Sequence, residues 1–265
     1  MKSALLKMKA FCAPPFFPPD RPAGPAPGFP VAVQIPRWKR ALDVTVVLLL
    51  LPFILPVALG IVLLIRLVSR GPILFKQERI GFRGAAFMCL KFRTMVVGAD
   101  TTNHQGHLHN LMTADAPMVK LDARGDSRII RFGVLVRAAG LDELPQLINV
   151  LRGEMSLVGP RPCLAYEFAR YLPWQRERFN TLPGLTGLWQ VSGKNRTTFS
   201  EMMHLDIDYV RRKTLWLDLL ILLRTFPAVL VQIWDTKFRR PVAVPSRREL
   251  HQPALRNTAI LPPAV

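Results

Sequence analysis

Two adjacent carboxylates are the side chains of this chain best suited to chemistry. Asp142 and Glu143 lie in the sequence LDELP, at the start of a helix that apolar spacing predicts over residues 141–152. A helix N-terminus carries free amide donors and partial positive charge, which keep a carboxylate ionised and attract phosphate. An ionised Asp142 could attack a phosphorus atom, and the pair could hold Mg²⁺ together with substrate phosphates. The alternative is structural: Asp142 caps the helix and Glu143 complements its dipole.

An arginine with a restricted backbone follows this helix. Arg161 lies between Pro160 and Pro162, and the two rings limit the conformations of the segment. A guanidinium can hold a phosphate through two parallel hydrogen bonds. The prolines could also mark only a rigid turn with a surface arginine. We expect Arg161 to bind a substrate phosphate, because an oriented arginine after a carboxylate pair favours phosphate chemistry.

Other cofactor sites find little support in the sequence. It contains no glycine-rich nucleotide loop of the Walker or dinucleotide type. Three histidines crowd one polar stretch without an obvious fourth ligand, so a solvated loop is favoured over zinc: His104, His107 and His109. The three cysteines are too widely spaced for a metal site and are expected to be reduced thiols: Cys12, Cys89 and Cys163.

An apolar run over residues 44–65 predicts that the carboxylate pair and Arg161 lie next to a membrane. It is long enough to cross a bilayer as a helix, but Pro52 and Pro56 interrupt it. Basic residues flank both ends, which favours the cytoplasmic side for both. They are Arg37, Lys39, Arg40, Arg66 and Arg70. We predict a re-entrant membrane helix over residues 37–70 that bends near Pro56; a kinked span is the alternative.

The composition agrees with work at a membrane surface. The 265 residues carry a net charge of +18, with an isoelectric point near 11.0, and half of them are hydrophobic. Nucleic acid is excluded as a partner, because no basic stretch is interleaved with stacking aromatics. Proline-rich tails are predicted at residues 1–36, which also argues against a signal peptide, and at residues 236–265. Residues 71–235 are predicted to form the catalytic domain on the cytoplasmic face.

The predicted fold class is α+β. Two short strands, 73–75 and 87–92, form a hairpin with its turn at 81–84. An amphipathic stretch over 167–179 is predicted to be a helix, either in the headgroup layer or packed on the core. A further apolar helix, 215–234, contains charged residues that are costly at the bilayer centre. It is therefore expected to be interfacial or buried in protein.

Seven motifs, in order over residues 39–234, carry a family resemblance. They are KRALD at 39–43, FKQERIG at 75–81, KFRTM at 91–95, LDELPQL at 141–147, GPRP at 159–162, PGLTGLWQ at 183–190 and DIDYV at 206–210. Each motif is weak alone, but together and in this order they are specific. The chain resembles the bacterial sugar transferases, the small monotopic phosphoglycosyl transferases that act on polyprenyl phosphate.

The resemblance implies a fold, a reaction and partners. It implies a small monotopic membrane domain with a re-entrant helix, amphipathic interfacial helices and a Mg²⁺-dependent site. It implies transfer of a sugar-1-phosphate from a nucleotide-diphosphate sugar, expected to be a UDP-sugar, to undecaprenyl phosphate in the bacterial inner membrane. The product would initiate exopolysaccharide, capsule or O-antigen synthesis. The alternatives are a glycosyltransferase that moves only the sugar and a non-enzymatic membrane scaffold.

The resemblance also implies residue roles. Asp142 matches the family nucleophile, and Glu143 matches its partner in a metal-binding dyad. The expected substrate-binding residues are Arg161, Lys91, Arg93, Lys194 and Asn195. The membrane motif comprises Arg40, Asp43 and Pro56. Asp218 matches a late acidic position, and a role as the buried partner of an arginine is its alternative.

The sequence departs from the family pattern at two positions. Leu55 precedes Pro56 where serine is frequent, so another group must satisfy the backbone at the bend. Lys194 stands where arginine is frequent, which keeps the charge but loses the guanidinium fork. The additional N-terminal spans and nucleotide-binding-like domain of larger relatives are not expected here.

Overall fold

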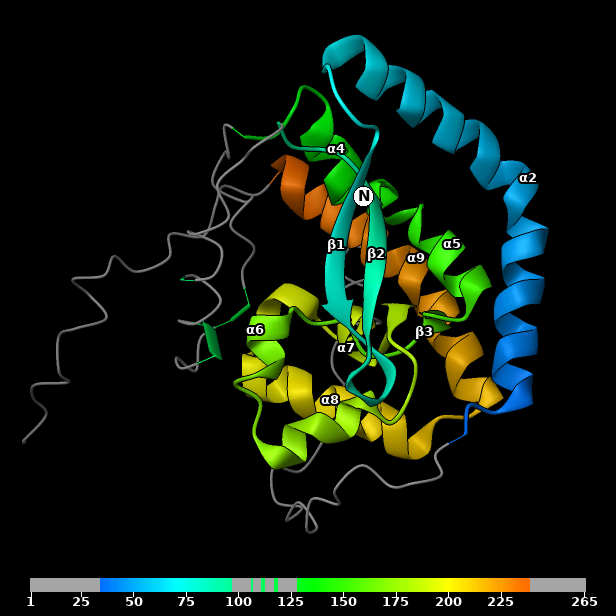
Figure 1. Cartoon of the computed structure of the whole chain (residues 1–265), viewed down its shortest axis with the longest axis vertical. Helices are drawn as coiled ribbons and strands as arrows, with labels where there is room; N and C mark the ends of the chain where they lie inside the picture. The colour runs from blue at the N-terminus through cyan, green and yellow to red at the C-terminus, as the bar shows by residue number, and fades with distance from the viewer. Residues whose placement is uncertain (1–33, 97–105, 107–110, 113–116, 119–127, 239–265) are drawn as a thin grey trace, which may run out of the picture.

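The computed structural model describes residues 34–96, 106, 111–112, 117–118 and 128–238 (Figure 1). It contains helices and short strands in the α+β arrangement predicted. The main elements are α2 (Arg37–Val68), β1 (Leu74–Ile80), β2 (Ala86–Phe92), α4 (Gly133–Ala138), α5 (Gln146–Arg152), β3 (Ser156–Val158), α6 (Ala165–Phe168), β4 (Gly184–Thr186), α7 (Leu188–Val191), α8 (Phe199–Arg212) and α9 (Leu215–Phe238). The predicted histidine loop, Cys12 and nearly all of both predicted tails lie outside the described residues.

Helix α2 is one continuous helix of 32 residues that includes both prolines. It begins at Arg37, directly after Pro36, and ends before Ser69. The ribbon bends part-way along the helix, which runs along one side of the molecule (Figure 1). The sequence predicts a bend near Pro56, and the helix stays continuous through both prolines, because each proline removes one backbone donor while the flanking turns keep theirs. The re-entrant path stays a prediction.

The predicted hairpin is confirmed. Strands β1 and β2 pair antiparallel, from Leu74 opposite Phe92 to Ile80 opposite Ala86. The first strand is longer than the prediction, because Lys76, Gln77 and Glu78 extend it with polar side chains that carry no apolar signal; Lys76 and Glu78 are exposed and Gln77 is half-buried. A 3₁₀ turn, Phe82–Gly84, connects the strands.

A second pair of strands, β3 and β4, is parallel and depends on glycine. Ser156 pairs with Gly184 and Val158 with Thr186. A Cβ atom on Gly184 would lie 2.1 Å from the backbone nitrogen of Gly159, which no side chain can tolerate. The glycines of the GPRP and PGLTGLWQ motifs thus allow two segments to touch backbone to backbone.

The predicted helix over 167–179 is wrong in its extent. The segment divides into α6 and a 3₁₀ helix, Pro173–Phe179, because Pro173 starts a new turn. Tyr171 and Phe179 are buried, and Arg178 is only 2% exposed. Of the two alternatives, packing on the core describes this segment.

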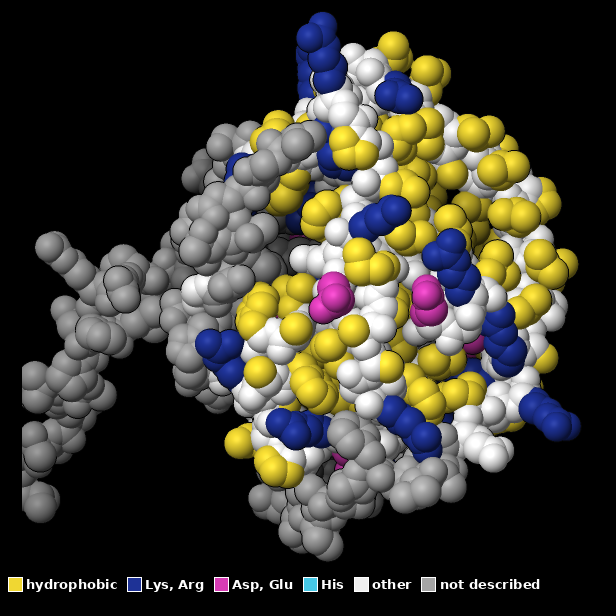
Figure 2. Space-filling model, in the orientation of Figure 1, with side chains coloured by type: hydrophobic (Ala, Val, Ile, Leu, Met, Phe, Trp, Pro, Cys, Tyr) yellow, Lys and Arg dark blue, Asp and Glu magenta, His cyan; other side chains and the backbone are white. Residues whose placement is uncertain are grey.

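The apolar surface of the molecule gathers on α2 and α9. Within the described residues, α2 and residues 215–235 of α9 are long and apolar enough to span a membrane. Only 11% of the most apolar window of each helix is buried, whereas a core helix of a soluble protein is mostly covered. Hydrophobic side chains cover the α2 flank in Figure 2. Both helices therefore offer an apolar face that the protein itself leaves open.

Candidate active site

The carboxylate pair lies on a short 3₁₀ turn, Leu141–Glu143, between α4 and α5. The predicted single helix over 141–152 is thus wrong at its start, and α5 begins only at Gln146, after Pro145. Gly140, with φ of +70°, turns the chain before Asp142. No side-chain cap bond is made at Gly140 or at Pro145, the residues that precede the two helices. Asp142 itself lies inside the 3₁₀ turn and at neither of the two N-cap positions.

The hairpin supplies a cation to this turn. Lys91 Nζ on β2 donates a 2.7 Å hydrogen bond to Glu143 Oε1. Their side chains are 23% and 35% exposed, whereas Asp142 is only 7% exposed. The ion pair is therefore open to solvent, and the neighbouring nucleophile candidate is largely covered.

Asn149 fixes the register between α5 and the hairpin. Its Oδ1 accepts from the backbone nitrogen of Leu90 at 3.1 Å, and its Nδ2 donates to the carbonyl of Met88 at 2.8 Å. The side chain is fully buried. Because Asn149 ties α5 directly to β2, it holds Lys91 next to Glu143. The helical spacing of this segment gave no sign of this polar contact.

Charges from three parts of the chain converge near the thiol of Cys89. Burial raises the pKa of Cys89, and the charges of four side chains act on it: Lys91, Arg79, Glu143 and Arg161. Burial also lowers the pKa of Arg79, and the positive charge of Arg161 lowers it further. Hydrogen bonds bring the same segments together: Lys91 of the hairpin reaches Glu143 in the carboxylate turn, and the Ile80 backbone nitrogen of the hairpin donates to the carbonyl of Cys163, directly after the GPRP segment.

The carboxylates suit a magnesium ion that is completed by substrate. Among the described residues, no group of three or more histidine, cysteine, aspartate or glutamate side chains could hold a metal. Mg²⁺ in nucleotide sites needs only one or two carboxylates together with phosphate oxygens and water. Asp142 and Glu143 are adjacent in the chain, and Glu143 contacts Lys91, so the pair offers the carboxylates of that donor set.

Lys194 lies near the end of α4. It occupies a 3₁₀ turn, Lys194–Arg196, and its Nζ donates to Gln232 Oε1 on α9 at 3.1 Å. Gln232 Nε2 in turn donates to the carbonyl of Ala138 at 3.0 Å. Lys194 is thus linked to the segment that leads into the carboxylate turn. Asn195 lies on the same 3₁₀ turn.

Arg93 makes structural contacts that its motif did not predict. Its guanidinium is buried and donates four hydrogen bonds to the chain just after α2: to the carbonyls of Ser69, Arg70 and Pro72 and to the Ser69 hydroxyl. These bonds fasten the end of the membrane helix to the end of β2. Arg93 therefore acts as a clamp, and its predicted contact with substrate has no support from this geometry.

The membrane motif fastens the start of α2 to the domain. Both terminal nitrogens of Arg40 donate to carbonyls at the C-terminal end of α5, those of Val150 and Leu151. Asp43 Oδ1 accepts 2.9 Å hydrogen bonds from the Ser156 hydroxyl and from the Leu157 backbone. These residues therefore link α2 to α5 and β3.

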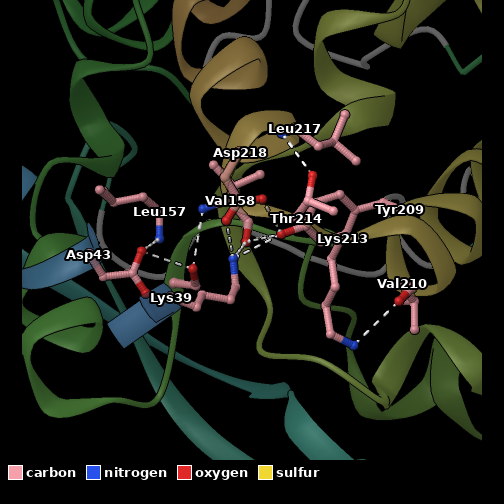
Figure 3. A network of polar contacts seen from close by, with 11 residues as sticks. Lys39, Asp43, Leu157, Val158, Tyr209, Val210, Lys213, Thr214, Leu217 and Asp218 are labelled. Carbon is pink, nitrogen blue, oxygen red and sulfur yellow. Dashed lines mark hydrogen bonds and ion pairs between the residues drawn. The ribbon is translucent and has the colours of Figure 1, made fainter. Parts of the chain in front are cut away.

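Asp218 is the buried partner of a cation, but the cation is Lys39 and not an arginine (Figure 3). Lys39 Nζ, fully buried, donates to Asp218 Oδ2 at 2.7 Å, to the Tyr209 hydroxyl at 2.8 Å and to the Val158 carbonyl at 2.8 Å. Tyr209 donates in turn to Asp218 Oδ1 at 2.7 Å. The network uses all three ammonium protons and joins α2, β3, α8 and α9.

A family model settles the relationship of the chain to known proteins. The model of the bacterial sugar transferases matches residues 35–232, which is about three quarters of the chain. The chain belongs to the bacterial sugar transferase family. The resemblance seen in the motifs is thereby confirmed, and the transferase is an enzyme. The alternative of a non-enzymatic scaffold is wrong.

Several curated relatives share the matched region. A UDP-glucose:undecaprenyl-phosphate glucose-1-phosphate transferase from Caulobacter vibrioides is 44% identical over 218 residues, which cover 79% of this chain and 74% of the relative. The exopolysaccharide production protein ExoY of Sinorhizobium fredii is 37% identical, with 72% and 84% covered. The galactosyl transferase CpsE of Streptococcus agalactiae is 41% identical over 73% of this chain, which spans only 42% of that relative.

Proposed function

We propose that this transferase moves a sugar-1-phosphate from a UDP-sugar to undecaprenyl phosphate at the cytoplasmic face of the bacterial inner membrane. The relative from Caulobacter vibrioides is named for this reaction with UDP-glucose. The observation that carries the proposal is the largely covered Asp142 beside the Lys91–Glu143 pair, on a domain fastened to both ends of an apolar helix. The product would initiate exopolysaccharide or related surface polysaccharide synthesis, in agreement with the name of the ExoY relative.

The first step forms a covalent intermediate on Asp142. A carboxylate oxygen attacks the β-phosphorus of the UDP-sugar, and the bond between that phosphorus and the bridging oxygen breaks. UMP leaves with the bridging oxygen, and the sugar phosphate stays on the aspartate as an acyl phosphate. Burial of Asp142 favours this step, because a carboxylate with few water contacts is a stronger nucleophile.

The second step regenerates the carboxylate. A phosphate oxygen of undecaprenyl phosphate attacks the same phosphorus, and the bond from phosphorus to Asp142 breaks. The product is undecaprenyl diphospho-sugar. The acceptor phosphate lies at headgroup depth, and the contacts of Arg93 and Asp43 tie the domain to α2, the helix proposed to lie at that depth.

Basic side chains stabilise the diphosphate. Arg161 would hold the oxygens of the transferred phosphoryl group as they gain charge, and Lys91 would exchange its contact with Glu143 for a phosphate oxygen. Mg²⁺, when bound by Asp142 and Glu143, would neutralise the diphosphate and help the nucleotide to leave. Lys194 and Asn195 are proposed to contact the nucleotide side of the donor.

The nucleotide product tests this function. The purified chain, supplied with undecaprenyl phosphate, Mg²⁺ and a panel of UDP-sugars, should release UMP with at least one donor. Labelled UMP should also exchange into that UDP-sugar without acceptor, because the first step is reversible. Release of UDP would show that only the sugar is moved, and the proposal would then be wrong.

A further inference from the structure

The GPRP segment is held by its carbonyl groups along its whole length. Five of the six carbonyls from residue 158 to 163 accept a hydrogen bond from another element. The pairs are Val158 from Lys39 at 2.8 Å, Pro160 from Gly184 at 2.8 Å, Arg161 from Arg178 at 2.8 Å, Pro162 from Arg79 at 3.2 Å and Cys163 from Ile80 at 2.9 Å. The backbone of Arg161 is therefore fixed on both sides.

Two of these donors are buried arginine side chains. Arg178 and Arg79 are 2% and 6% exposed. Burying a guanidinium costs free energy unless its N–H groups donate hydrogen bonds. Each of these two arginines is therefore expected to have hydrogen-bond partners that offset the cost of its burial. What they share is that one arm of each reaches the backbone next to the Arg161 side chain.

Each of the two guanidinium groups is anchored by further hydrogen bonds. Arg178 Nη2, the nitrogen that reaches the Arg161 carbonyl, also donates to Asp206 Oδ2 at 2.5 Å, and its Nη1 donates to the Tyr171 hydroxyl at 2.9 Å. Arg79 donates from two nitrogens to Gln77 Oε1, at 2.7 and 3.1 Å. Neither Arg178 nor Arg79 is free to swing toward a ligand, so both are suited to hold the backbone.

We propose that Arg178 and Arg79 are positioning residues that fix the Arg161 guanidinium for the phosphoryl group. They act on the reaction only through Arg161. The proposal rests on the proposed function of Arg161 and extends it, because prolines alone set φ but do not fix where the segment lies relative to the carboxylate turn. Four carbonyls from 160 to 163, held from β4, from the Pro173–Phe179 turn and from β1, do fix that place.

Lysine substitutions separate this role from simple packing. In Arg178→Lys the cation next to Asp206 is kept, but a single ammonium lacks the second terminal nitrogen, which donates to Tyr171 and holds the plane of the guanidinium while the first reaches Asp206 and the Arg161 carbonyl. The GPRP backbone then becomes more mobile, and the Arg161 guanidinium is no longer held in a fixed position relative to the phosphoryl group. Misplacement by about 1 Å can lower turnover about 100-fold, so we expect kcat to fall at least about tenfold.

A double-mutant cycle tests the proposal. UMP release is measured for Arg178→Lys, for Arg161→Ala and for the combination, with radiolabelled UDP-sugar to follow slow turnover. We expect Arg178→Lys to lower kcat at least about tenfold in the natural background but by less than about twofold in the Arg161→Ala background. A residue that merely supports the fold would lower kcat by the same factor in both.

The ion pair Arg211–Glu177 provides a matched control. It joins the same two elements, the Pro173–Phe179 turn and α8, but lies at the surface and does not contact the GPRP segment. Arg211→Lys should leave kcat unchanged in both backgrounds. If Arg178→Lys does not give a folded protein in thermal unfolding, Arg79→Lys enters the same cycle with the same expectation.

The outcomes distinguish the two levels of the proposal. Equal losses of kcat in the two backgrounds, with Arg161→Ala impaired, would overturn the positioning role and leave the proposed function intact. Full activity of Arg161→Ala would overturn the role of Arg161 itself, and with it the positioning role.

Discussion

At the scale of single residues, the Lys91–Glu143 pair suits the proposed binding of both a metal and a diphosphate. Both side chains are partly exposed, so their ion pair contributes little net stability and can open at little cost. In the proposed reaction, the ammonium would gain a phosphate oxygen and the carboxylate would gain the metal. Without substrate, the ion pair thus holds the ammonium proposed to bind phosphate and the carboxylate proposed to bind the metal next to each other, one residue from Asp142 in the sequence.

Asp142→Asn should abolish both half-reactions. The amide has nearly the same shape but is a much weaker nucleophile, so UMP release and UMP exchange should fall at least about a thousandfold. The measurement is nucleotide release with and without acceptor. Asp208→Asn, at a partly exposed ion pair on α8, is the control and should keep activity. Normal turnover by Asp142→Asn would exclude a covalent role.

Glu143→Gln and Lys91→Gln should shift the Mg²⁺ requirement in opposite directions. Loss of the carboxylate should raise the half-saturating Mg²⁺ concentration about tenfold, since a metal ligand is removed. Loss of the lysine should lower it, because the ammonium no longer competes for Glu143. Lys91→Gln should also raise KM for the UDP-sugar.

Titration of activity with Mg²⁺ at saturating donor measures this pair of effects. An unchanged Mg²⁺ dependence of Glu143→Gln would count against a metal-binding role. A higher half-saturating Mg²⁺ concentration in Lys91→Gln would mean that the lysine helps the metal to bind and does not compete with it.

At the scale of elements, the structure shows how short pieces of secondary structure are held in one arrangement. Helix α5 and strands β3 and β4 have only seven, three and three residues, too few to be stable alone. They are fixed by side chains from distant elements and by glycines that let backbones meet. The motifs therefore mark contacts between elements as well as residues of the site.

Gly184→Ala should destabilise the fold strongly. The new methyl group would lie 2.1 Å from the nitrogen of Gly159, and the neighbour is backbone that cannot move aside. Overpacking of this kind costs about 1–3 kcal/mol or more. Gly60→Ala on α2, where no other atom lies within 4 Å, is the control and should not destabilise. The readout is the thermal unfolding midpoint of the detergent-solubilised chain.

Breaking the Lys39–Asp218 pair should also destabilise the fold. Lys39→Met leaves a buried carboxylate without its cation, which costs about 3–5 kcal/mol. The double variant Lys39→Met with Asp218→Leu should recover part of this loss, because no unpaired charge remains. Arg212→Ala removes an exposed pair with Asp208 and should cost less than about 1 kcal/mol. No recovery in the double variant would argue against charge burial as the cause.

At the scale of the whole molecule, charge and hydrophobicity are divided in a way that suits one side of a membrane. The apolar faces of α2 and α9 are open, and basic residues stand near both ends of α2. The clamps at Arg93 and Asp43 tie both ends of α2 to the same domain. A helix whose two ends are held by one domain is difficult to place across a bilayer, which favours the re-entrant path.

Labelling from the two sides of the membrane tests that topology. Single cysteines are introduced by Arg37→Cys or Arg70→Cys, in a Cys12→Ser background in which Cys89 and Cys163 are buried. Both should react with a membrane-impermeant maleimide in inverted vesicles and not in intact spheroplasts. Reaction of either position in spheroplasts would show a full span and overturn the re-entrant path. Reaction of the Arg70→Cys variant there would also place the catalytic domain, which follows α2, on the periplasmic side, away from the UDP-sugar.

Much of the candidate site could be predicted from the sequence, because its signals are local. The adjacent carboxylates, the prolines around Arg161 and the apolar run with basic flanks are each contained in one short segment. Periodicity likewise predicted the hairpin and the C-terminal apolar helix. It failed over 167–179 and at the start of 141–152, where proline and glycine divide a regular pattern into short turns.

What the sequence by itself determined is the family, the order of the chemical groups and the membrane segment. Only the tertiary structure decided the partners of those groups. Asp218 pairs with Lys39, which lies 179 positions away in the sequence, and Lys91 pairs with Glu143, which lies 52 positions away. A buried charge such as Asp218 is stable only next to its counterpart. For both pairs the physical reason is that the choice of counterpart depends on packing among distant elements, which no local pattern encodes.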